Sequence, residues 1–248
     1  MTRNFSAWPI YLLLGVLSAP LAIMYLFLVI DTFTNAPPGS LIPSELTLHH
    51  WRFLWDPTVT GDIWGPTVTT FLFASSMVVI VLAISSTAGY AISRLNLPFR
   101  RFFLSGIMVM HAFPSVTLII GVFLVLQFAG LYNTLIGVIL VKASLMLPFG
   151  IWIMKGFYDQ VPWEIEMAGV QDGASRFTVW RRLILPQVAP GLLSLGIFAF
   201  LDGWSEFMLP RILAPSANFQ VLSTYLNAVS DPNSTTYNFH LFKSVGLF

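Results

Sequence analysis

The chain has 248 residues, of which 56% are hydrophobic and only 9% are charged, and its formal net charge is +1. Soluble domains carry roughly a quarter charged residues. This composition therefore excludes an ordinary soluble domain and predicts an integral membrane protein. The chain contains no cysteine, which excludes disulfides and cysteine-based metal sites.

Apolar stretches long enough to cross a bilayer recur along the chain, since a membrane-spanning helix needs about 20 residues. Four stretches are continuous: Trp8–Ile30, Thr67–Ile92, Phe102–Phe128 and Leu131–Met154. A fifth stretch, Pro190–Leu209, is interrupted by polar residues. Continuous runs are typical of helices rather than of barrel strands. We therefore predict an all-α, polytopic bundle in one transmembrane domain over residues 1–248, with kinks at Pro114 and Pro148.

The two ends of the chain also carry apolar segments. The first run is too long for the apolar region of a signal peptide, and no small-residue cleavage site follows it. We interpret it as the first membrane helix. A new apolar run begins at Leu241 and reaches Phe248, which favours a sixth helix cut off at the C-terminus over a five-helix protein.

Lys and Arg are distributed unequally between the predicted loops. By the positive-inside rule, the N-terminus and the loop 156–189 are predicted to be cytoplasmic, and the loop 34–65 to be extracytoplasmic. The cytoplasmic side would hold Arg3, Arg94, Arg100, Arg101, Lys155, Arg176, Arg181 and Arg182, and the outer side only Arg52, Arg211 and Lys243.

Within the loop 34–65, the helical spacing of Leu48, Trp51 and Leu54 predicts a short helix in Leu46–Leu54 at the outer interface. His49 and His50 are adjacent, so they would point in different directions on a helix. A surface role is favoured over metal binding for this pair, and no metal site is predicted.

The stretch Val161–Pro190 gathers charged side chains inside an otherwise apolar protein. Pro162 suits the first position of a helix, and Glu164 and Glu166 place negative charge in its first turn, where the helix dipole favours it. Asp172-Gly173 predicts the end of this helix. A second helical stretch, Phe177–Leu183, is expected to follow.

The first of these helices has an apolar edge formed by Trp163, Met167 and Val170, which recur at intervals of four and three residues. Such an edge could seat in a groove on another protein, or the helix could lie on the lipid surface. Periodicity alone does not separate the two interpretations.

The spacing in this loop carries a family resemblance. Gly173 is followed by nine residues and then by Leu183-Ile184-Leu185-Pro186. The loop resembles that of permease subunits of bacterial ABC importers, which reads E-A-A-x-x-x-G, nine residues, then I-x-L-P. In a gap-free alignment Met167-Ala168-Gly169 occupy the E-A-A positions, so Met167 stands where the family has its glutamate.

The likeness covers nearly the whole chain and is strongest to the carbohydrate-uptake group, most of all to the maltose-type inner-membrane subunit. The segments that carry it are Pro162-Trp163-Glu164-Ile165-Glu166, Asp172-Gly173-Ala174-Ser175, Tyr90-Ala91-Ile92-Ser93-Arg94, Leu147-Pro148-Phe149 and Trp204-Ser205-Glu206-Phe207.

The resemblance implies a type I ABC importer permease in the bacterial cytoplasmic (inner) membrane. It would pair with a second homologous permease, an ATP-binding subunit dimer and an extracytoplasmic solute-binding protein, and it implies no nucleic acid. Closure of the ATPase dimer would move the loop helices and switch the membrane helices between inward-facing and outward-facing states. The residues expected to couple to the ATPase are Glu164, Glu166, Met167, Ala168, Gly169, Asp172, Gly173, Ala174, Leu183 and Pro186.

The chain contains no G-x-x-x-x-G-K-[ST] phosphate-binding loop. We therefore expect no enzymatic activity and no bound cofactor in this subunit. ATP and Mg would bind at the partner ATPase.

Ionisable residues at membrane depth are costly and point to function. Lys142, Asp202 and Glu206 are such residues, and Asp202 and Glu206 would share one helix face. A substrate pathway could use them together with the aromatic side chains of Trp152 and Trp204, and a sugar could also bond to Gln127, Tyr132 and Asn133. A purely structural ion pair stays open as the alternative. Lys142 alone also hints at an anionic ligand such as a sugar phosphate.

Two other functions fit a polytopic chain with intramembrane charge. A secondary transporter would not need the loop described above, and it is typically longer with an internal repeat. A membrane scaffold without transport activity would use the loop only as a docking site. The sequence does not name the solute.

Overall fold

The computed structural model describes residues 8–37, 40, 43, 45–231 and 238–248 of the chain. Arg3 of the predicted cytoplasmic N-terminus lies outside these residues. The described residues form helices and one isolated β-bridge, between Thr34 and Leu46. The chain divides into two compact units, residues 1–64 with 225–248, and residues 65–224. The all-α fold predicted from the sequence is confirmed.

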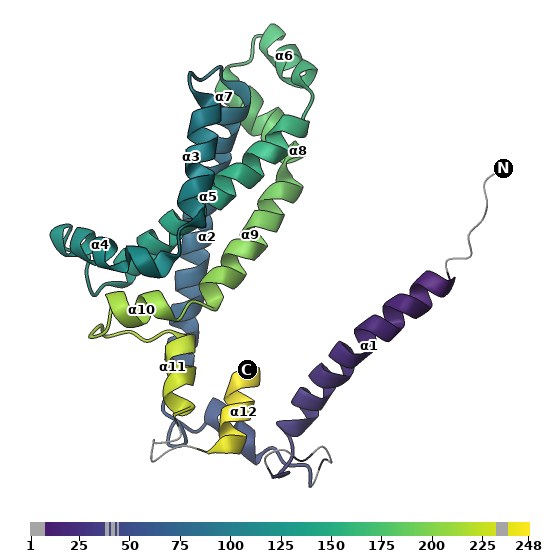
Figure 1. Ribbon diagram of the computed structural model, residues 1–248, viewed down its shortest axis with the longest axis vertical. Helices are drawn as coiled ribbons and strands as arrows, with labels where there is room; N and C mark the ends of the chain where they lie inside the picture. The colour runs from purple at the N-terminus through teal and green to yellow at the C-terminus, as the bar shows by residue number, and fades with distance from the viewer. Residues whose placement is uncertain (1–7, 38–39, 41–42, 44, 232–237) are drawn as a thin grey trace. The chain divides into compact units, whose positions relative to one another are not determined.

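The unit of residues 65–224 is built on long helices that run side by side (Figure 1). These are α2 (Trp64–Arg94), α3 (Arg100–Ala112), α5 (Leu135–Gln160) and α9 (Ala189–Trp204). α5 lies between α3 and α9 and packs on both. Small residues allow close approach between helices, as expected in lipid. A Cβ atom at Gly203 would lie only 3.2 Å from the Cα of Ala74.

The third predicted span is not one continuous helix. The structure divides Phe102–Phe128 into α3, which ends at Ala112, and α4 (Ser115–Phe128), and the two helices point in different directions (Figure 1). Pro114 has no N–H to donate and forces the preceding residue, Phe113, into an extended conformation with ψ 131°. Pro148 has no such effect, because α5 continues through it.

The fifth predicted span also differs from its expected limits. α9 ends at Trp204 rather than at Leu209, and the short helix α10 (Met208–Leu213) follows. The Glu206 carboxylate accepts a hydrogen bond from the backbone N–H of Leu209 at 3.0 Å, which favours a new helix start there. Asp202 and Glu206 therefore do not share one continuous helix face, as the sequence had suggested.

In the part of the chain that the structure describes, three helices are long and apolar enough to cross a membrane, and up to five spans result if each bent pair counts as one. The three are α1 (Trp8–Asp31), α2 and α5. The bent pairs are α3 with α4, and the segment Arg176–Gln187 with α9, which meet at 72°.

The unit of residues 1–64 and 225–248 contains α1, the 3₁₀ helix η1 (His49–Leu54) and α12 (Phe239–Leu247), while α11 (Leu222–Val229) begins in the other unit. The short helix predicted in Leu46–Leu54 is thus present but narrower. Lys243 of α12 forms an ion pair with Asp31 at 2.7 Å, at the end of α1.

The two adjacent histidines of this unit have different surroundings. His49 is exposed, as predicted for both. His50 is buried, accepts or donates a 2.8 Å hydrogen bond with the side chain of Asn35, and stacks on His240 with ring centroids 4.8 Å apart. The predicted surface role is therefore wrong for His50, because α12 covers its ring.

Candidate functional site

The charged loop between α5 and α9 folds as predicted into two helical stretches. α6 spans Trp163–Gln171, and Pro162 precedes it as the N-cap rather than as its first residue. Asp172 is the C-cap of α6, and the next residue, Gly173, takes a φ of +86°, the left-handed conformation that glycine adopts most readily. The second stretch begins earlier than predicted and consists of α7 (Arg176–Val179) and the π-helix η2 (Trp180–Ile184), followed by α8 (Leu185–Gln187).

A buried polar cluster holds α6 against the rest of its unit. Glu166 is one of the predicted coupling residues, yet its side chain is only 3% exposed. The hydroxyl of Tyr90 donates to its Oε1 at 2.7 Å, and Arg94 Nε lies 3.4 Å from its Oε2. Arg94 also donates to the backbone carbonyls of Tyr158 at 2.9 Å and Val161 at 2.5 Å. One arginine on α2 thus links α6 to the end of α5.

Gly169 provides the second contact between α6 and its surroundings. A Cβ atom at this position would lie 2.7 Å from Leu183 Cδ1 and 2.9 Å from Val179 Cγ2. The absence of a side chain therefore lets α6 lie directly on α7 and η2. Glu166 and Gly169 are three residues apart, so they define one inward face of the helix.

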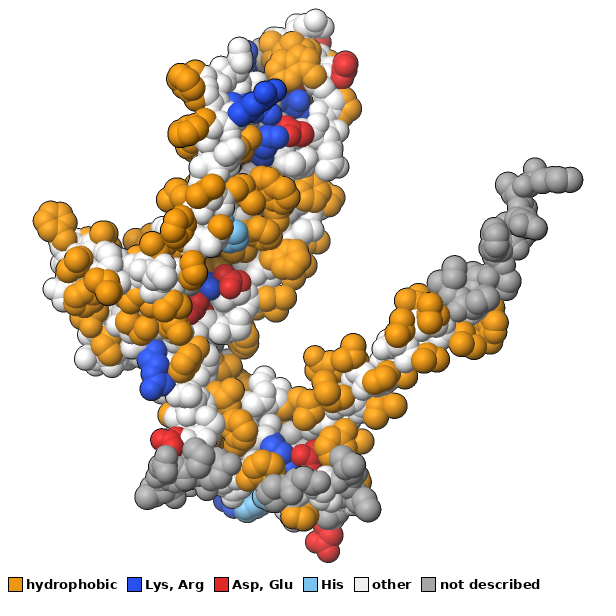
Figure 2. Space-filling model, in the orientation of Figure 1, with side chains coloured by type: hydrophobic (Ala, Val, Ile, Leu, Met, Phe, Trp, Pro, Cys, Tyr) orange, Lys and Arg blue, Asp and Glu red, His pale blue; other side chains and the backbone are white. Residues whose placement is uncertain are grey.

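The larger apolar side chains of α6 flank this inward face and are partly exposed. Trp163 is 42% exposed and Val170 is 36% exposed, while Met167 is half-buried. Arg94 lies over the Trp163 ring at 5.5 Å from its centroid, and Ile165 packs on the core of the unit. Among the other predicted coupling residues, Glu164, Ala168, Asp172, Gly173, Leu183 and Pro186 are exposed, and Ala174 is half-buried. Figure 2 shows Lys and Arg side chains gathered near this end of the unit.

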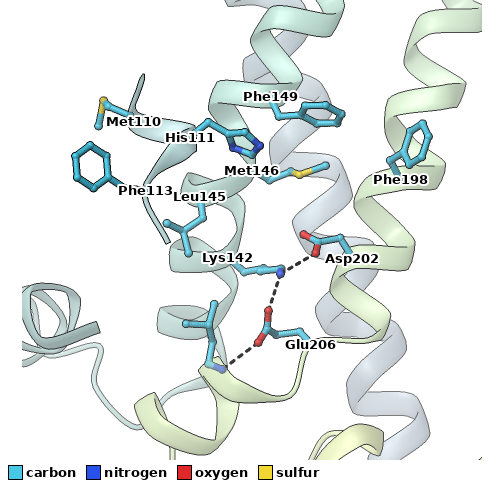
Figure 3. A pocket seen from close by; sticks show the side chains of 11 residues that line it. Met110, His111, Phe113, Lys142, Leu145, Met146, Phe149, Phe198, Asp202 and Glu206 are labelled. Carbon is cyan, nitrogen blue, oxygen red and sulfur yellow. Dashed lines mark hydrogen bonds and ion pairs between the residues drawn. The ribbon is translucent and has the colours of Figure 1, made fainter. Parts of the chain in front are cut away.

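A second candidate site is a cavity of about 460 Å³ at the middle of the same unit. Lys142 of α5 lies between two carboxylates, with its Nζ 3.0 Å from Asp202 Oδ1 and 2.5 Å from Glu206 Oε2. Figure 3 shows the three side chains pointing toward one another, with the ring of Phe149 farther along α5 and the ring of His111 beside it on α3. The pairing that the sequence suggested for Lys142 is present. It forms because the chain leaves the α9 helix after Trp204 and brings Glu206 back toward α5.

The other residues predicted for the substrate pathway do not line this cavity. Trp152 is half exposed, and Trp204 stacks on Phe200. Gln127 is exposed, Tyr132 packs edge-on against Phe123, and the Asn133 side chain accepts from the backbone N–H of Ser216. Tyr132 and Asn133 thus contact neighbouring parts of the fold around the turn after α4.

Sequence reasoning missed the other residues that line the cavity, among them His111 and Phe149, whose rings stack with centroids 5.6 Å apart. A histidine inside the long apolar run was a signal that could have found the first, because polar residues at membrane depth point to function. It also missed the roles of Tyr90 and Arg94, which only the packing reveals. Among the described residues, no group of three or more His, Cys, Asp or Glu side chains could hold a metal ion.

Known proteins resemble this chain in sequence and in fold. Residues 80–239 match the family described as binding-protein-dependent transport system inner membrane component. The trehalose transport system permease protein SugB of Mycobacterium tuberculosis is 28% identical over 84% of this chain and 75% of its own length. The diacetylchitobiose uptake system permease protein DasC of Streptomyces coelicolor is 29% identical over 77% of this chain and 71% of its own length.

Among solved structures, a bacterial ABC transporter involved in the import of the acidic polysaccharide alginate has the same fold. One of its chains superposes with a TM-score of 0.78 at 18% identity, covering 100% of the present chain and 93% of that chain. The family match spans more than half of the residues and includes the complete loop with α6. The chain therefore belongs to the binding-protein-dependent transport system inner membrane components, as the multi-pass permease subunit of an ABC importer.

Proposed function

We propose that this chain is the permease through which a sugar or sugar-like solute enters the cell, driven by a partner ATPase that docks on α6. The partly exposed apolar side chains of α6 carry the proposal. An exposed apolar edge at Trp163 and Val170 is costly in water unless another protein covers it. The permeases named above for trehalose and diacetylchitobiose support a sugar as the solute.

The partners follow from this role. A second homologous permease completes the pathway, an ATP-binding subunit dimer binds ATP and Mg, and an extracytoplasmic solute-binding protein delivers the solute. The loop 156–189 and the N-terminus then face the cytoplasm, and the loop 34–65 faces outward. The basic side chains near α6 and α7 support this orientation.

Movement of α6 reaches the membrane helices through the buried cluster. A displacement of α6 moves Glu166, and the contacts of Glu166 with Tyr90 and Arg94 transmit this movement to the end of α2. Arg94 also holds the backbone where α5 passes into α6. Three elements therefore move together, which rigid-body switching between two states requires.

The cavity around Lys142 supports a place on the solute pathway for this subunit. Its size falls in the range of about 300–1,000 Å³ that small-molecule sites occupy, and it combines aromatic walls with three ionised groups. The alternative, a purely structural ion pair, explains Lys142 and Glu206 but not why Asp202 stays 44% exposed beside an open cavity.

The docking of the ATPase can be tested at Ala168, which is exposed on α6. Replacement of Ala168 by Trp is expected to lower solute-stimulated ATP hydrolysis of the reconstituted complex at least about tenfold, because the new ring fills the space that the ATPase must occupy. Ala228→Trp, at an exposed position of α11, is the matched control. Unchanged stimulation in Ala168→Trp would refute the coupling role. Purification without any ATPase would favour a secondary transporter or a scaffold.

A further inference from the structure

The cavity around Lys142 carries a net negative charge despite the lysine at its centre. One positive and two negative side chains line it, which leaves a formal charge of −1 with His111 neutral. Lys142 and Glu206 are only 12% and 11% exposed, so these two charges are screened little by water. The lysine is therefore already neutralised and has little attraction left for an anionic solute.

The three ionised groups differ in what they can offer a ligand. Glu206 uses both oxygens, since Oε1 accepts from the N–H of Leu209 and Oε2 pairs with Lys142. Lys142 uses two of its three donors on the carboxylates. Asp202 receives its bond from Lys142 on Oδ1 and stays 44% exposed, so its second oxygen faces the cavity. Asp202 is the group that can contact a solute.

The walls of the cavity suit a ring with one apolar face. The stacked rings of His111 and Phe149 form one side, and Phe113 and Phe198 are exposed at its margin. The C–H face of a sugar ring packs on aromatic side chains, while its hydroxyl groups donate to a carboxylate. A carboxylate accepts such bonds more strongly than a neutral group does.

We propose that this cavity is a solute subsite for neutral or amine-bearing sugars, that Asp202 contacts the solute, and that the negative charge of the cavity excludes anionic sugars. The proposal rests on the sugar-import function given above. An anionic group could approach Lys142 only by displacing Asp202 or Glu206, and a displaced Glu206 would be a buried charge without its partner. The interpretation of Lys142 as a mark of an anionic ligand is thereby reversed.

The test measures solute binding to the purified complex of this chain with its partner subunits in nanodiscs, without the solute-binding protein. The probes share one frame: the neutral disaccharide that best stimulates ATP hydrolysis, its 6-phosphate and its 6-amino derivative. Wild type is expected to bind the neutral and amino forms at least about tenfold more tightly than the phosphate, as one uncompensated unit charge a few ångströms away requires.

Two variants should change the ratio of the affinity for the neutral disaccharide to the affinity for its 6-phosphate in opposite directions. Asp202→Asn removes the net charge and is expected to reduce the preference over the phosphate about tenfold. Lys142→Gln makes the cavity more negative and is expected to increase the preference for the neutral disaccharide over the phosphate. Asp56→Asn, at a half-buried aspartate of the other unit that pairs with Arg52, is the control for the same substitution and leaves the ratio unchanged.

The outcomes separate this subsite from the proposed function. If neutral disaccharides stimulate ATP hydrolysis but the phosphate binds equally well, or Asp202→Asn leaves the ratio unchanged, the subsite assignment is overturned while sugar import stands. If no sugar stimulates hydrolysis, both fail. If Asp202→Asn does not assemble, an unchanged ratio in Lys142→Gln overturns the assignment in its place.

Discussion

The buried carboxylate of Glu166 gives the sharpest prediction about how α6 is held. Glu166→Gln keeps the shape of the side chain but removes the charge that pairs with Arg94 and accepts from Tyr90. Breaking a buried ion pair costs about 3–5 kcal/mol. Arg94 retains its two backbone carbonyl acceptors, and glutamine can still accept from Tyr90, so we expect a loss of about 2 kcal/mol in the docking of α6.

Hydrogen–deuterium exchange of the α6 amides measures this loss directly, because local opening is governed by local stability. A loss of about 2 kcal/mol corresponds to roughly 30-fold faster exchange. Peptides from the middle of α5 should exchange as in wild type, since the cluster touches only the end of that helix.

Glu164→Gln is the matched control, because Glu164 lies two residues away on the exposed side of α6. Its exchange should stay within about twofold of wild type, as surface substitutions away from packed features have small effects. Equal exchange rates in the two variants would refute the anchoring role of Glu166.

Two further predictions concern packing and pH. Gly169→Val is expected to lower the free energy of unfolding by about 1–3 kcal/mol, because the new side chain overpacks against Leu183 and Val179. Thermal unfolding measures this loss, and Ala168→Val, at the exposed neighbouring position, is the control. Equal stabilities of the two variants would contradict the expected overpacking. In the other unit, burial holds the pKa values of His50 and His240 below their ordinary 6.5, and the neighbouring His240 adds to the shift at His50 while Lys243 adds to it at His240. The unfolded chain therefore binds more protons below about pH 6.5, and the packing of α12 on η1 should weaken as the pH falls through that value. Hydrogen–deuterium exchange of the η1 and α12 amides would follow this change. A pH dependence that persists in a His50→Asn, His240→Asn double variant, beyond the intrinsic pH dependence of exchange, would contradict the assignment.

The sequence predicted the helices of this protein better than their breaks. Long apolar runs identify segments that must form helices in lipid, since every backbone group needs an internal partner. The break at Pro114 and the continuity through Pro148 could not be separated, because a proline interrupts or is absorbed according to the packing around it. The end of α9 at Trp204 likewise depends on the contact of Glu206 with Lys142 and Leu209.

The residues of the candidate sites also differ in how well the sequence predicted them. Charges at membrane depth predicted the meeting of Lys142 with Asp202 and Glu206, because isolated charges there are costly. Aromatic residues gave no such signal, so Trp152 and Trp204 were expected at the site without a physical constraint to place them. Glu166 was expected to couple to the ATPase, yet its side chain is buried. Its partners come from α2, more than 70 residues earlier, and no local pattern links segments so distant.

The way α6 is attached bears on the exchange of parts between related permeases. Its two fully buried residues are a carboxylate and a glycine, and Ile165 adds a half-buried apolar contact with the core. The carboxylate is useful only where the tyrosine and arginine of α2 receive it. A chimaera that takes the loop from one permease and α2 from another would therefore leave either the glutamate of α6 or the arginine of α2 without its partner. The loop and the end of α2 therefore function as one unit. A chimaera should keep α6 docked only when both segments come from the same parent permease.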